Sequence, residues 1–267
     1  MTTATDRYLF TNDWADARQR LNLLEEVFDP GTIRHLEHLG VSKGWHCLEV
    51  GAGAGSIAIW LSTRIGSAGR VLATDSNISL LEPVKLPNLN VRRHDILTDD
   101  LPERRSFDLI HTRALLCHLP ERERALDRIV ACLKPGGWLL VEEPDFVSQH
   151  LVSTDKDAQA LFRKVTDAKA QLDEVRGFDA YYGRCVFDAL RRRGMSKVAA
   201  EGRVPITAGA SPMARFWTVS LMQIHGAFLA AGEVTDNYLR TYTDLLADPS
   251  NVFIWPVMVA TWAQKGE

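Results

Sequence analysis

Residues 44–145 alternate short apolar runs with longer segments of helical period. The apolar runs predict strands at 45–50, 70–75, 90–94, 107–111 and 138–142, and the periodic segments predict helices at 56–65 and 121–133. Short strands that alternate with helices form a parallel sheet covered on both faces. Because the crossovers are right-handed, the carboxyl ends of the strands meet at one edge, where ligands bind in sheets of this type.

The alternation is absent on both sides of this region. Before it, apolar residues at helical spacing predict a helix at 14–28 with Asp13 as its N-cap, a break at 29–32, and a second helix at 32–39. After residue 146, the pattern predicts helices at 155–174, 187–193, 212–230 and 235–246, and extended segments at 197–205 and 252–262. Pro256 marks a bulge or an edge in the last of these segments.

The composition is that of a folded, soluble chain. With 267 residues, 46% of them hydrophobic, it is long enough for one sizeable domain with its own core. A net charge of -3 gives no electrostatic footprint for nucleic acid or an anionic membrane. The N-terminus lacks the apolar run of a signal peptide, and no apolar stretch is long enough to span a bilayer, so we expect a cytoplasmic protein. The cysteines form neither zinc-site spacing nor a disulfide framework: Cys47, Cys117, Cys132 and Cys185.

A glycine-rich stretch lies at the end of the first predicted strand and reads Glu49-Val50-Gly51-Ala52-Gly53-Ala54-Gly55-Ser56. Glycines allow a tight turn and a close backbone approach to a ligand, and the following helix directs the positive end of its dipole to the same place. The dinucleotide fingerprint G-x-G-x-x-G would require glycine where this chain has Ser56. The carboxylate of Glu49 would also repel a pyrophosphate, but it suits a cationic amino-acid group.

The acidic-x-G-x-G-x-G pattern resembles motif I of the class I S-adenosylmethionine (SAM) methyltransferases. The resemblance covers 44–145 and is greatest with the bacterial small-molecule branch, near the quinone-type and natural-product methyltransferases. It implies an α/β fold: a doubly wound, seven-stranded, mostly parallel sheet with an antiparallel last strand and a helical substrate cover. A single domain would comprise a helical N-terminal cover (1–43), the SAM-binding core (44–145), the sheet completion with the helical cover (146–250) and the final strand (251–267).

The resemblance places the cofactor along the carboxyl edge of the sheet. The loop residues under its methionine and ribose would be Gly51, Ala52, Gly53, Gly55 and Ser56. Asp75, twenty residues after Gly55, would accept both ribose hydroxyls with Ser76 beside it; a surface turn is the alternative. Asp95 would accept the adenine amino group and Ile96 would flank the ring, unless Asp95 is a turn or N-cap residue. Glu49 would either bind the SAM ammonium or hold the glycine loop through backbone amides, and both interpretations stay open.

Further cofactor contacts are implied near the fourth strand and before the first. They are Thr112 and Arg113 after the fourth strand, and Tyr8 and Arg20 in the segment before the first strand. Arg113 would pair with the carboxylate of SAM; the alternative is a salt bridge to Glu121 or Glu123. For the two residues of the first segment, surface and capping roles are the alternative.

Acceptor and catalytic residues are predicted from residue type and position. The catalytic candidates, which could act as a base or orient the acceptor, are His118, Glu143, His225 and Tyr181. The candidate acceptor contacts are Phe216, Trp217, His225 and Tyr182, since an aromatic and apolar cover suits a mostly apolar molecule. Packing in the core or on the surface is the alternative for each. No metal ligand is expected, because Thr112-Arg113-Ala114 supplies no carboxylate after the fourth strand.

These features predict SAM-dependent methyl transfer to an O, N or C atom of a small molecule, such as a natural product, a quinone-like compound or another mostly apolar metabolite. The methyl group of SAM is already activated, so the transfer is an in-line displacement for which the protein supplies alignment and exclusion of water. Two alternatives stay open: a methyltransferase fold that catalyses a non-methylating reaction such as cyclisation, and a non-catalytic SAM-binding module. We expect no nucleic-acid or membrane partner, and a homodimer is possible.

Overall fold

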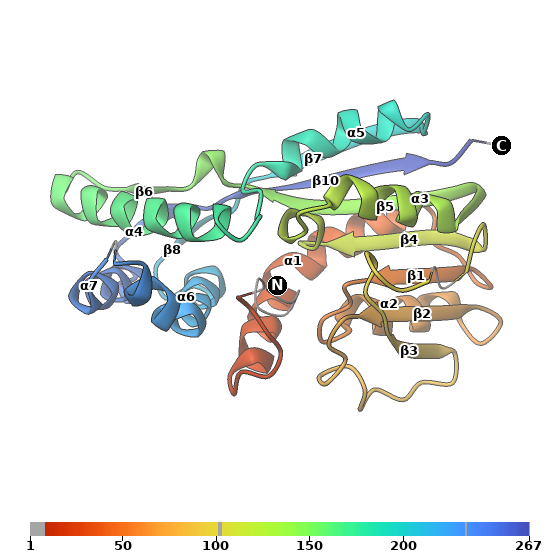
Figure 1. Cartoon of the computed structure of the whole chain (residues 1–267), viewed down its shortest axis with the longest axis horizontal. Helices are drawn as coiled ribbons and strands as arrows, with labels where there is room; N and C mark the ends of the chain where they lie inside the picture. Colours follow the sequence, from red (N-terminus) through yellow and green to blue (C-terminus); the bar gives the residue numbers. More distant parts are fainter. Residues whose placement is uncertain (1–8, 101–102, 233, 267) are drawn as a thin grey trace.

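The main sheet follows the predicted architecture (Figure 1). The computed structural model describes residues 9–100, 103–232 and 234–266. In these ranges the sheet has seven strands: β1 (His46–Val50), β2 (Arg70–Asp75), β3 (Leu89–Arg93), β4 (Phe107–Arg113), β5 (Leu133–Asp145), β7 (Ser196–Arg203) and β10 (Val257–Gln264). Their order is β3-β2-β1-β4-β5-β10-β7. The first five run parallel, and β10 runs antiparallel to both of its neighbours, which confirms the predicted fold class.

Helices cover both faces of this sheet. α1 (Ala17–His38) and α2 (Ser56–Ile65) pack on one face, while α3 (Arg122–Cys132) and α5 (Val186–Arg192) pack on the other (Figure 1). Strand side chains alternate between the two cores. Cys47 and Leu109 belong to the core under α1 and α2, whereas Leu48 and Ile110 belong to the core under α3 and α5. The sheet is therefore buried on both sides, and its strand ends are left to form a site.

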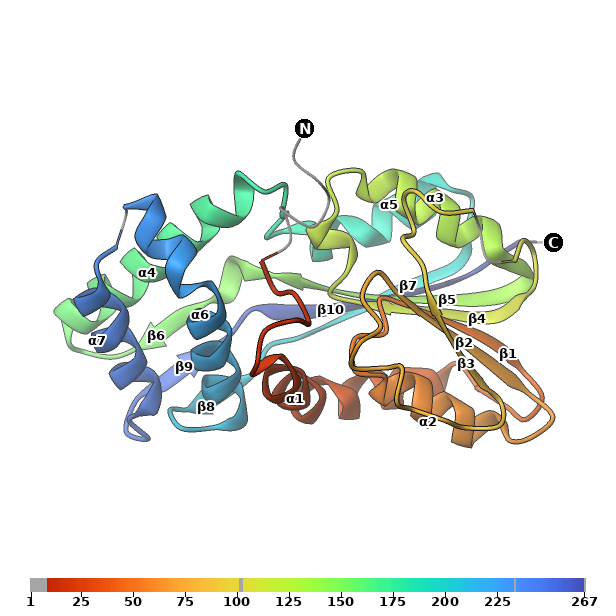
Figure 2. The same cartoon turned by 60° about the horizontal axis from the view of Figure 1, so that its bottom comes forward.

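Beyond the carboxyl edge lie helices that the sequence predicted and a small sheet that it did not (Figure 2). The helices are α4 (Lys156–Glu174), α6 (Pro212–Ala231) and α7 (Asp236–Ala247). The small sheet has the order β6-β9-β8, with β6 (His150–Val152), β8 (Ile206–Ala208) and β9 (Val252–Ile254). These elements share an apolar core that includes Phe162, Phe228 and Phe253. None of the helices in the described ranges has the length and hydropathy needed to cross a bilayer.

Helix α1 corrects the prediction of two helices separated by a break at 29–32. It runs unbroken through Pro30. Proline removes one backbone donor and normally ends a helix, but the residues around it have partners on the sheet. Asp29 pairs with Arg113 over 2.8 Å, and the Thr32 hydroxyl accepts a second bond from the same guanidinium. These contacts anchor the turn around the proline and keep the backbone helical.

The last predicted strand, 252–262, proves to be two strands. The chain divides at Trp255-Pro256, so that β9 belongs to the small sheet and β10 to the main sheet. Pro256 cannot donate to a ladder, and the Trp255 side chain is fully buried. The Trp255 ring stacks on Trp217 of α6, with the ring centroids 5.9 Å apart. This dipeptide therefore connects the two sheets.

Candidate active site

The loop between β1 and α2 has a conformation that its glycines allow. Gly51, Gly53 and Gly55 have φ angles of 74°, 57° and 93°, a region in which a side chain would be strained. The Gly51 amide donates to the Thr74 carbonyl over 2.8 Å. At Gly55, a Cβ atom would lie only 2.3 Å from Leu81 Cδ1. The loop is thus held against the end of β2 and leads into the amino-terminal end of α2, where backbone amides favour an anionic or hydrogen-bond-accepting group.

Asp75 ends β2 and contacts the glycine loop directly. Its carboxylate accepts hydrogen bonds from the amides of Gly53 and Asn77, each over 2.9 Å. Burial raises the pKa of Asp75, and the hydrogen bonds from neighbouring amides oppose that rise. The amide and the hydroxyl of Ser76 also donate to this carboxylate. Ser76 is exposed beside it.

Asp95 follows β3 at the same edge of the sheet. Its Oδ1 accepts a hydrogen bond from the Leu97 amide over 2.8 Å. This is the turn conformation that was the alternative to a ligand role for Asp95. Ile96 is 4% exposed and belongs to the core. Thr112, at the end of β4, is fully buried, and its hydroxyl has no hydrogen-bond partner among the described residues. The glycine loop, the Asp75 carboxylate beside it and the unpartnered Thr112 hydroxyl form a set that fits the expected SAM.

The segment before α1 and the first turn of α1 lie along the loop that follows β2. Asn12 Nδ2 donates to the Asn77 carbonyl over 3.0 Å, and Arg18 donates to the Leu80 carbonyl over 2.7 Å. The prediction that Asp13 caps this helix is wrong, because α1 begins at Ala17. Asp13 instead accepts a hydrogen bond from the Asn77 side chain over 3.0 Å. These contacts bring residues before β1 to the edge that carries Asp75.

Helix α1 also reaches the start of α2, through a residue that the sequence did not single out. The half-buried Glu25 accepts a hydrogen bond from the Ser56 amide, and burial together with the nearby Asp29 carboxylate raises the pKa of Glu25. Arg20, a predicted cofactor contact, is 5% exposed, and its guanidinium lies over an aromatic ring of the preceding segment. Tyr8 lies outside the described residues.

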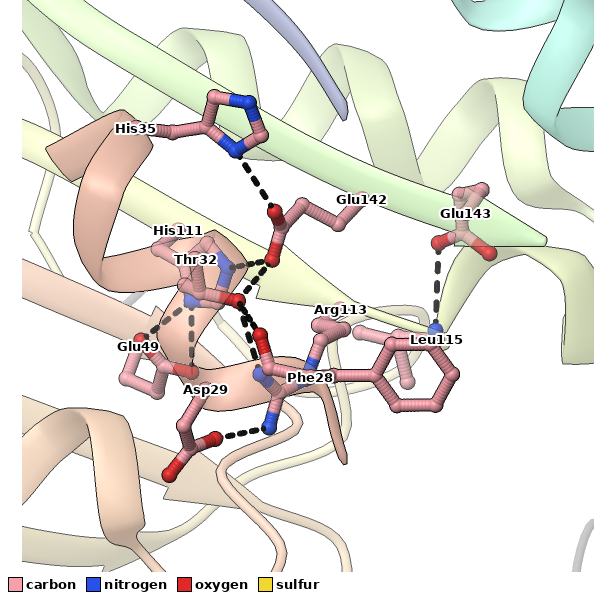
Figure 3. Close-up of polar contacts among 10 residues, drawn as sticks. All are labelled: Phe28, Asp29, Thr32, His35, Glu49, His111, Arg113, Leu115, Glu142 and Glu143. Atoms are coloured by element: carbon pink, nitrogen blue, oxygen red, sulfur yellow. Dashed lines mark hydrogen bonds and ion pairs between the residues drawn. The ribbon is translucent and has the colours of Figure 1, made fainter. Parts of the chain in front are cut away.

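A chain of buried ionisable groups crosses the sheet under α1 (Figure 3). Both oxygens of Glu49 lie 2.9 Å from His111 Nδ1, and His111 Nε2 lies 3.3 Å from Glu142 Oε2. Glu142 Oε1 lies 3.2 Å from His35 Nδ1 on α1. All four residues are less than 10% exposed. Both oxygens of Glu49 are thus bound to His111, and the Gly53 amide of the glycine loop donates to Asp75 instead.

The charges in this chain are set by their mutual contacts. Burial alone would lower the pKa of His111, but the carboxylates of Glu49 and Glu142 outweigh it and raise that pKa to about 9. Burial would raise the pKa of Glu142, and the hydrogen bonds from His111 and His35 outweigh it and lower that pKa. His111 is thus an imidazolium between two carboxylates at neutral pH. Glu142 and His35 also line a cavity of about 220 Å³ between α1, α6 and β10, so the chain of groups has access to an open space.

Arg113 links the end of β4 to α1 (Figure 3). Its guanidinium donates to Asp29 Oδ1 and to the Thr32 hydroxyl, each over 2.8 Å. The Thr32 hydroxyl also contacts the Glu142 carboxylate. The alternative salt bridge to the glutamates of the next helix is wrong, because α1 supplies the partner. With its side chain 8% exposed, Arg113 fixes α1 over the sheet.

Glu143 lies on the opposite face of β5 from Glu142 and holds the loop after β4 (Figure 3). Its fully buried carboxylate accepts from the amides of Leu115, Leu116 and Cys117, over 3.2, 2.7 and 3.1 Å. Burial raises the pKa of Glu143, and these amides oppose the rise. The carboxylate is thus occupied by backbone donors, and it positions the segment that carries His118.

His118 lies at the end of this segment, among aromatic rings. Its imidazole centroid is 4.7 Å from that of Phe178 and 6.3 Å from that of Phe10. Burial lowers the pKa of His118 to about 3, with the positive charges of Lys169 and Arg20 adding to the effect. The imidazole is therefore neutral at physiological pH and is a weak base.

The remaining candidates do not lie together. Trp217 of α6 is near this aromatic group: its ring contacts Phe146, which follows β5, and Phe216, with centroids 5.7 and 5.8 Å apart. The other three candidates lie elsewhere: His225 pairs with Asp236 of α7, Tyr181 is 50% exposed, and Tyr182 is 2% exposed in the core under α3 with its hydroxyl donating to Glu123. The structure thus brings His118 and Trp217 together past the strand ends.

A family model described as a methyltransferase domain matches residues 7–191, more than half of the 267-residue chain. The chain belongs to this family. The methyltransferase str2 of Strobilurus tenacellus is 36% identical over 137 residues, 51% of this chain and 48% of that protein. The ubiquinone/menaquinone biosynthesis C-methyltransferase UbiE of Pseudoalteromonas translucida is 36% identical over 111 residues, 39% of this chain and 44% of that protein. The chain therefore spans about half the length of the curated relatives it matches.

Among solved structures, the chain is similar to phosphoethanolamine N-methyltransferase 2 of Haemonchus contortus in complex with phosphomonomethylethanolamine and S-adenosylhomocysteine. The similarity covers 99% of this chain and 58% of that chain. The TM-score is 0.53 and the identity is 17%, a likeness that shows the fold. Family membership confirms the predicted class I SAM-dependent methyltransferase and SAM as its cofactor. Because relatives come from a fungus as well as from bacteria, the family, rather than its bacterial branch, is what the matches establish.

Within this methyltransferase fold, the buried ion chain is the feature that sequence reasoning missed. A signal for it exists: Glu49, His111 and Glu142 each directly follow an apolar run in a predicted strand. In the register of the sheet, Glu49 is directly opposite His111. Adjacent residues of parallel strands share a face, so the three charges lie together once the strand order is known.

Proposed function

We propose that the chain transfers a methyl group from SAM to a small, mostly apolar acceptor. The observation that carries this proposal is the junction of β1, α2 and β2, where three glycines in the left-handed region lie beside a carboxylate that already binds the loop. SAM supplies a methyl group activated by its sulfonium, so the acceptor atom bonds to the methyl carbon as the carbon–sulfur bond breaks. The protein then has to bind SAM and the acceptor, align them and exclude water. This alignment can lower the free-energy barrier by about 7–11 kcal/mol.

We assign the cofactor contacts by their place along the carboxyl edge. Asp75 would accept the ribose hydroxyls in place of the exposed Ser76 hydroxyl, and Asp95 with Ile96 would contact the adenine. The loop would lie under the ribose and methionine: Gly51, Ala52, Gly53, Gly55 and Ser56. The buried hydroxyl of Thr112 would gain a partner in the bound state. Glu49 and Arg113 act indirectly in this proposal, because their side chains bind His111 and α1.

The acceptor would lie past the ends of β4 and β5. His118 and Trp217 border this place with aromatic surface, which suits an apolar molecule and excludes water. A neutral His118 can hydrogen-bond an acceptor, whereas Glu143 positions the loop through its amides. Catalytic roles for His225 and Tyr181 stay predictions, since each lies at an exposed position.

The cofactor site is tested by the Asp75→Ala variant. Removing charge-assisted hydrogen bonds to the ribose should weaken SAM binding at least about tenfold in calorimetry, since such bonds contribute about 1.5–3 kcal/mol. The matched control is Asp100→Asn, an exposed carboxylate in the loop after β3. Circular dichroism checks that the fold is retained. Unchanged SAM affinity in the Asp75 variant would remove this residue from the site.

Methyl transfer is tested by the release of S-adenosylhomocysteine on incubation with SAM and a panel of aromatic acids, phenols and amines. Its appearance with one class supports the proposal. Binding of SAM without any release of this product would favour the alternatives of a non-methylating reaction or a binding module. Binding of NAD in preference to SAM would refute the assignment of the loop.

A further inference from the structure

An ammonium group is enclosed by aromatic rings where the acceptor is proposed to bind. Lys169 Nζ, on α4, lies between 5.3 and 5.9 Å from the centroids of four rings: Phe10, Phe146, Phe178 and Trp217. Phe146 follows the end of β5, and Phe178 contacts His118, which follows the end of β4. The cluster therefore lies directly past the two strands that face the proposed acceptor. Asp173, one turn further along α4, pairs with the ammonium.

Hydrogen-bond donors without acceptors lie next to this ammonium. Lys169, Trp217 and Ser220 line the same small cavity between α4 and α6, with a volume of about 10 Å³. Trp217 Nε1 and Ser220 Oγ are both buried and have no hydrogen-bond partner among the described residues. An indole N–H and an ammonium can only donate, and a buried donor left unpaired is costly. The cavity has room for one oxygen-sized group.

We propose that Lys169, Trp217 and Ser220, the donor cluster, bind an ionised oxygen of the methyl acceptor. The inference rests on the proposed function and names its substrate class: a molecule with a carboxylate or a phenol-type oxygen attached to an apolar, conjugated body. The oxygen takes the unpaired donors, and the body lies against the surrounding rings. A cationic acceptor is disfavoured, because the aromatic enclosure already contains the Lys169 charge.

The charges around the cluster support the sign of this ligand. Lys169 and Arg20 both act on His118 as positive charges, and together with burial they keep the imidazole neutral. The carboxylate of Asp173 pairs with the Lys169 ammonium. The rings of the enclosure stabilise a cation by cation–π contacts but supply no hydrogen-bond acceptor for a second one. An ionised oxygen would therefore accept from the donors of this cavity, whereas an amine would bring further donors to it.

The test is calorimetry on the full chain loaded with S-adenosylhomocysteine, with four probes of similar size. Benzoate and 4-nitrophenolate carry an ionised oxygen, benzamide is neutral, and benzylammonium is a cation. We expect benzoate or 4-nitrophenolate to bind at least about tenfold more tightly than benzamide and benzylammonium, as for a charge-assisted bond. Comparison of the two anions separates a carboxylate from a phenol-type ligand.

Three variants assign the binding to the donor cluster. Trp217→Phe and Ser220→Ala each remove one donor and keep the packing, and each should weaken the preferred anion by about threefold or more. The double variant Lys169→Gln/Asp173→Asn removes both charges without leaving one buried alone, and it should abolish the preference for anions. Trp262→Phe, at a half-buried indole on β10, is the matched control and should bind the anion like the wild type.

Each outcome decides the inference. It is overturned if all probes bind equally, if benzylammonium is preferred, or if neither anion binds. It is also overturned if the three variants leave anion binding unchanged, because the cavity would then hold only a water molecule. Affinity for S-adenosylhomocysteine is measured in the same titrations and should be the same in every variant. A wild-type chain that fails to bind this compound refutes the proposed function itself, a result distinct from loss of the anion preference.

Discussion

Replacement of His111 tests the buried ion chain, because this imidazolium is the positive charge between two carboxylates. The folded protein raises the pKa of His111 to about 9, from an ordinary value of about 6.5. At about 1.4 kcal/mol for each pH unit between these values, the protonated form adds about 3 kcal/mol to the free energy of unfolding. A raised pKa stabilises the fold below the ordinary value, so the contribution is complete below about pH 6.5 and is lost as pH rises through about 9.

In the variant His111→Gln, Glu49 and Glu142 lose their shared partner. Leaving buried charges uncompensated typically costs about 3–5 kcal/mol, and we expect a loss of that size at pH 6.5. The difference between wild type and variant should shrink by about 3 kcal/mol between pH 6.5 and a pH above 9, because the wild type then loses the imidazolium as well.

The measurement is urea unfolding, followed by tryptophan fluorescence, of both proteins between pH 6.5 and 9.5. His38→Gln, at the exposed last residue of α1, is the control and should change stability by less than about 0.5 kcal/mol. A stability difference between wild type and His111→Gln that stays constant over this pH range would refute the assignment of the charged form. A variant as stable as the wild type at pH 6.5 would refute the energetic role of the chain.

Two further predictions concern the loop and the core. Gly55→Ala, with its φ of 93° and a Cβ atom 2.3 Å from Leu81, should cost about 1–3 kcal/mol in urea unfolding and weaken SAM binding in calorimetry. Gly226→Ala on α6, where nothing lies within 4 Å of the new Cβ, should instead stabilise by up to about 1 kcal/mol, and the opposite order would contradict the geometry. Tyr182→Phe should cost about 0.5–1.5 kcal/mol through its lost bond to Glu123, with turnover unchanged. A fall in kcat/KM with unchanged stability would place the Tyr182 hydroxyl at the acceptor.

The part of the fold that sequence predicts best is the region whose signals are local. The helix expected at 56–65 and the strand expected at 70–75 have the observed bounds, because glycines, apolar periodicity and an acidic strand end mark each boundary within a few residues. The predicted break at Pro30 is wrong, because Arg113, far along the chain, binds the turn around this proline. The division of the last strand likewise depends on Trp217, which stacks on Trp255.

The candidate site divides in the same way. Asp75 and the glycines could be found from sequence, because each follows a strand whose end is visible in the pattern. The contact of Glu49 with His111 could not, since it requires that β1 and β4 be neighbours although two strands separate them in sequence. The donor cluster could not be predicted from the sequence either. Lys169 and Trp217 come from two helices, and no local sequence signal shows how these helices pack together.

The dipeptide Trp255-Pro256 makes this chain suitable for an optical experiment. The Trp255 indole donates to the Thr207 hydroxyl over 2.8 Å and stacks on α6, while two residues later the chain pairs with β5 at Asp145. A change in the position of the helices α4, α6 and α7 relative to the main sheet must therefore alter the surroundings of this indole. The fluorescence of a variant that retains this tryptophan alone would report such a rearrangement in real time, without an added label.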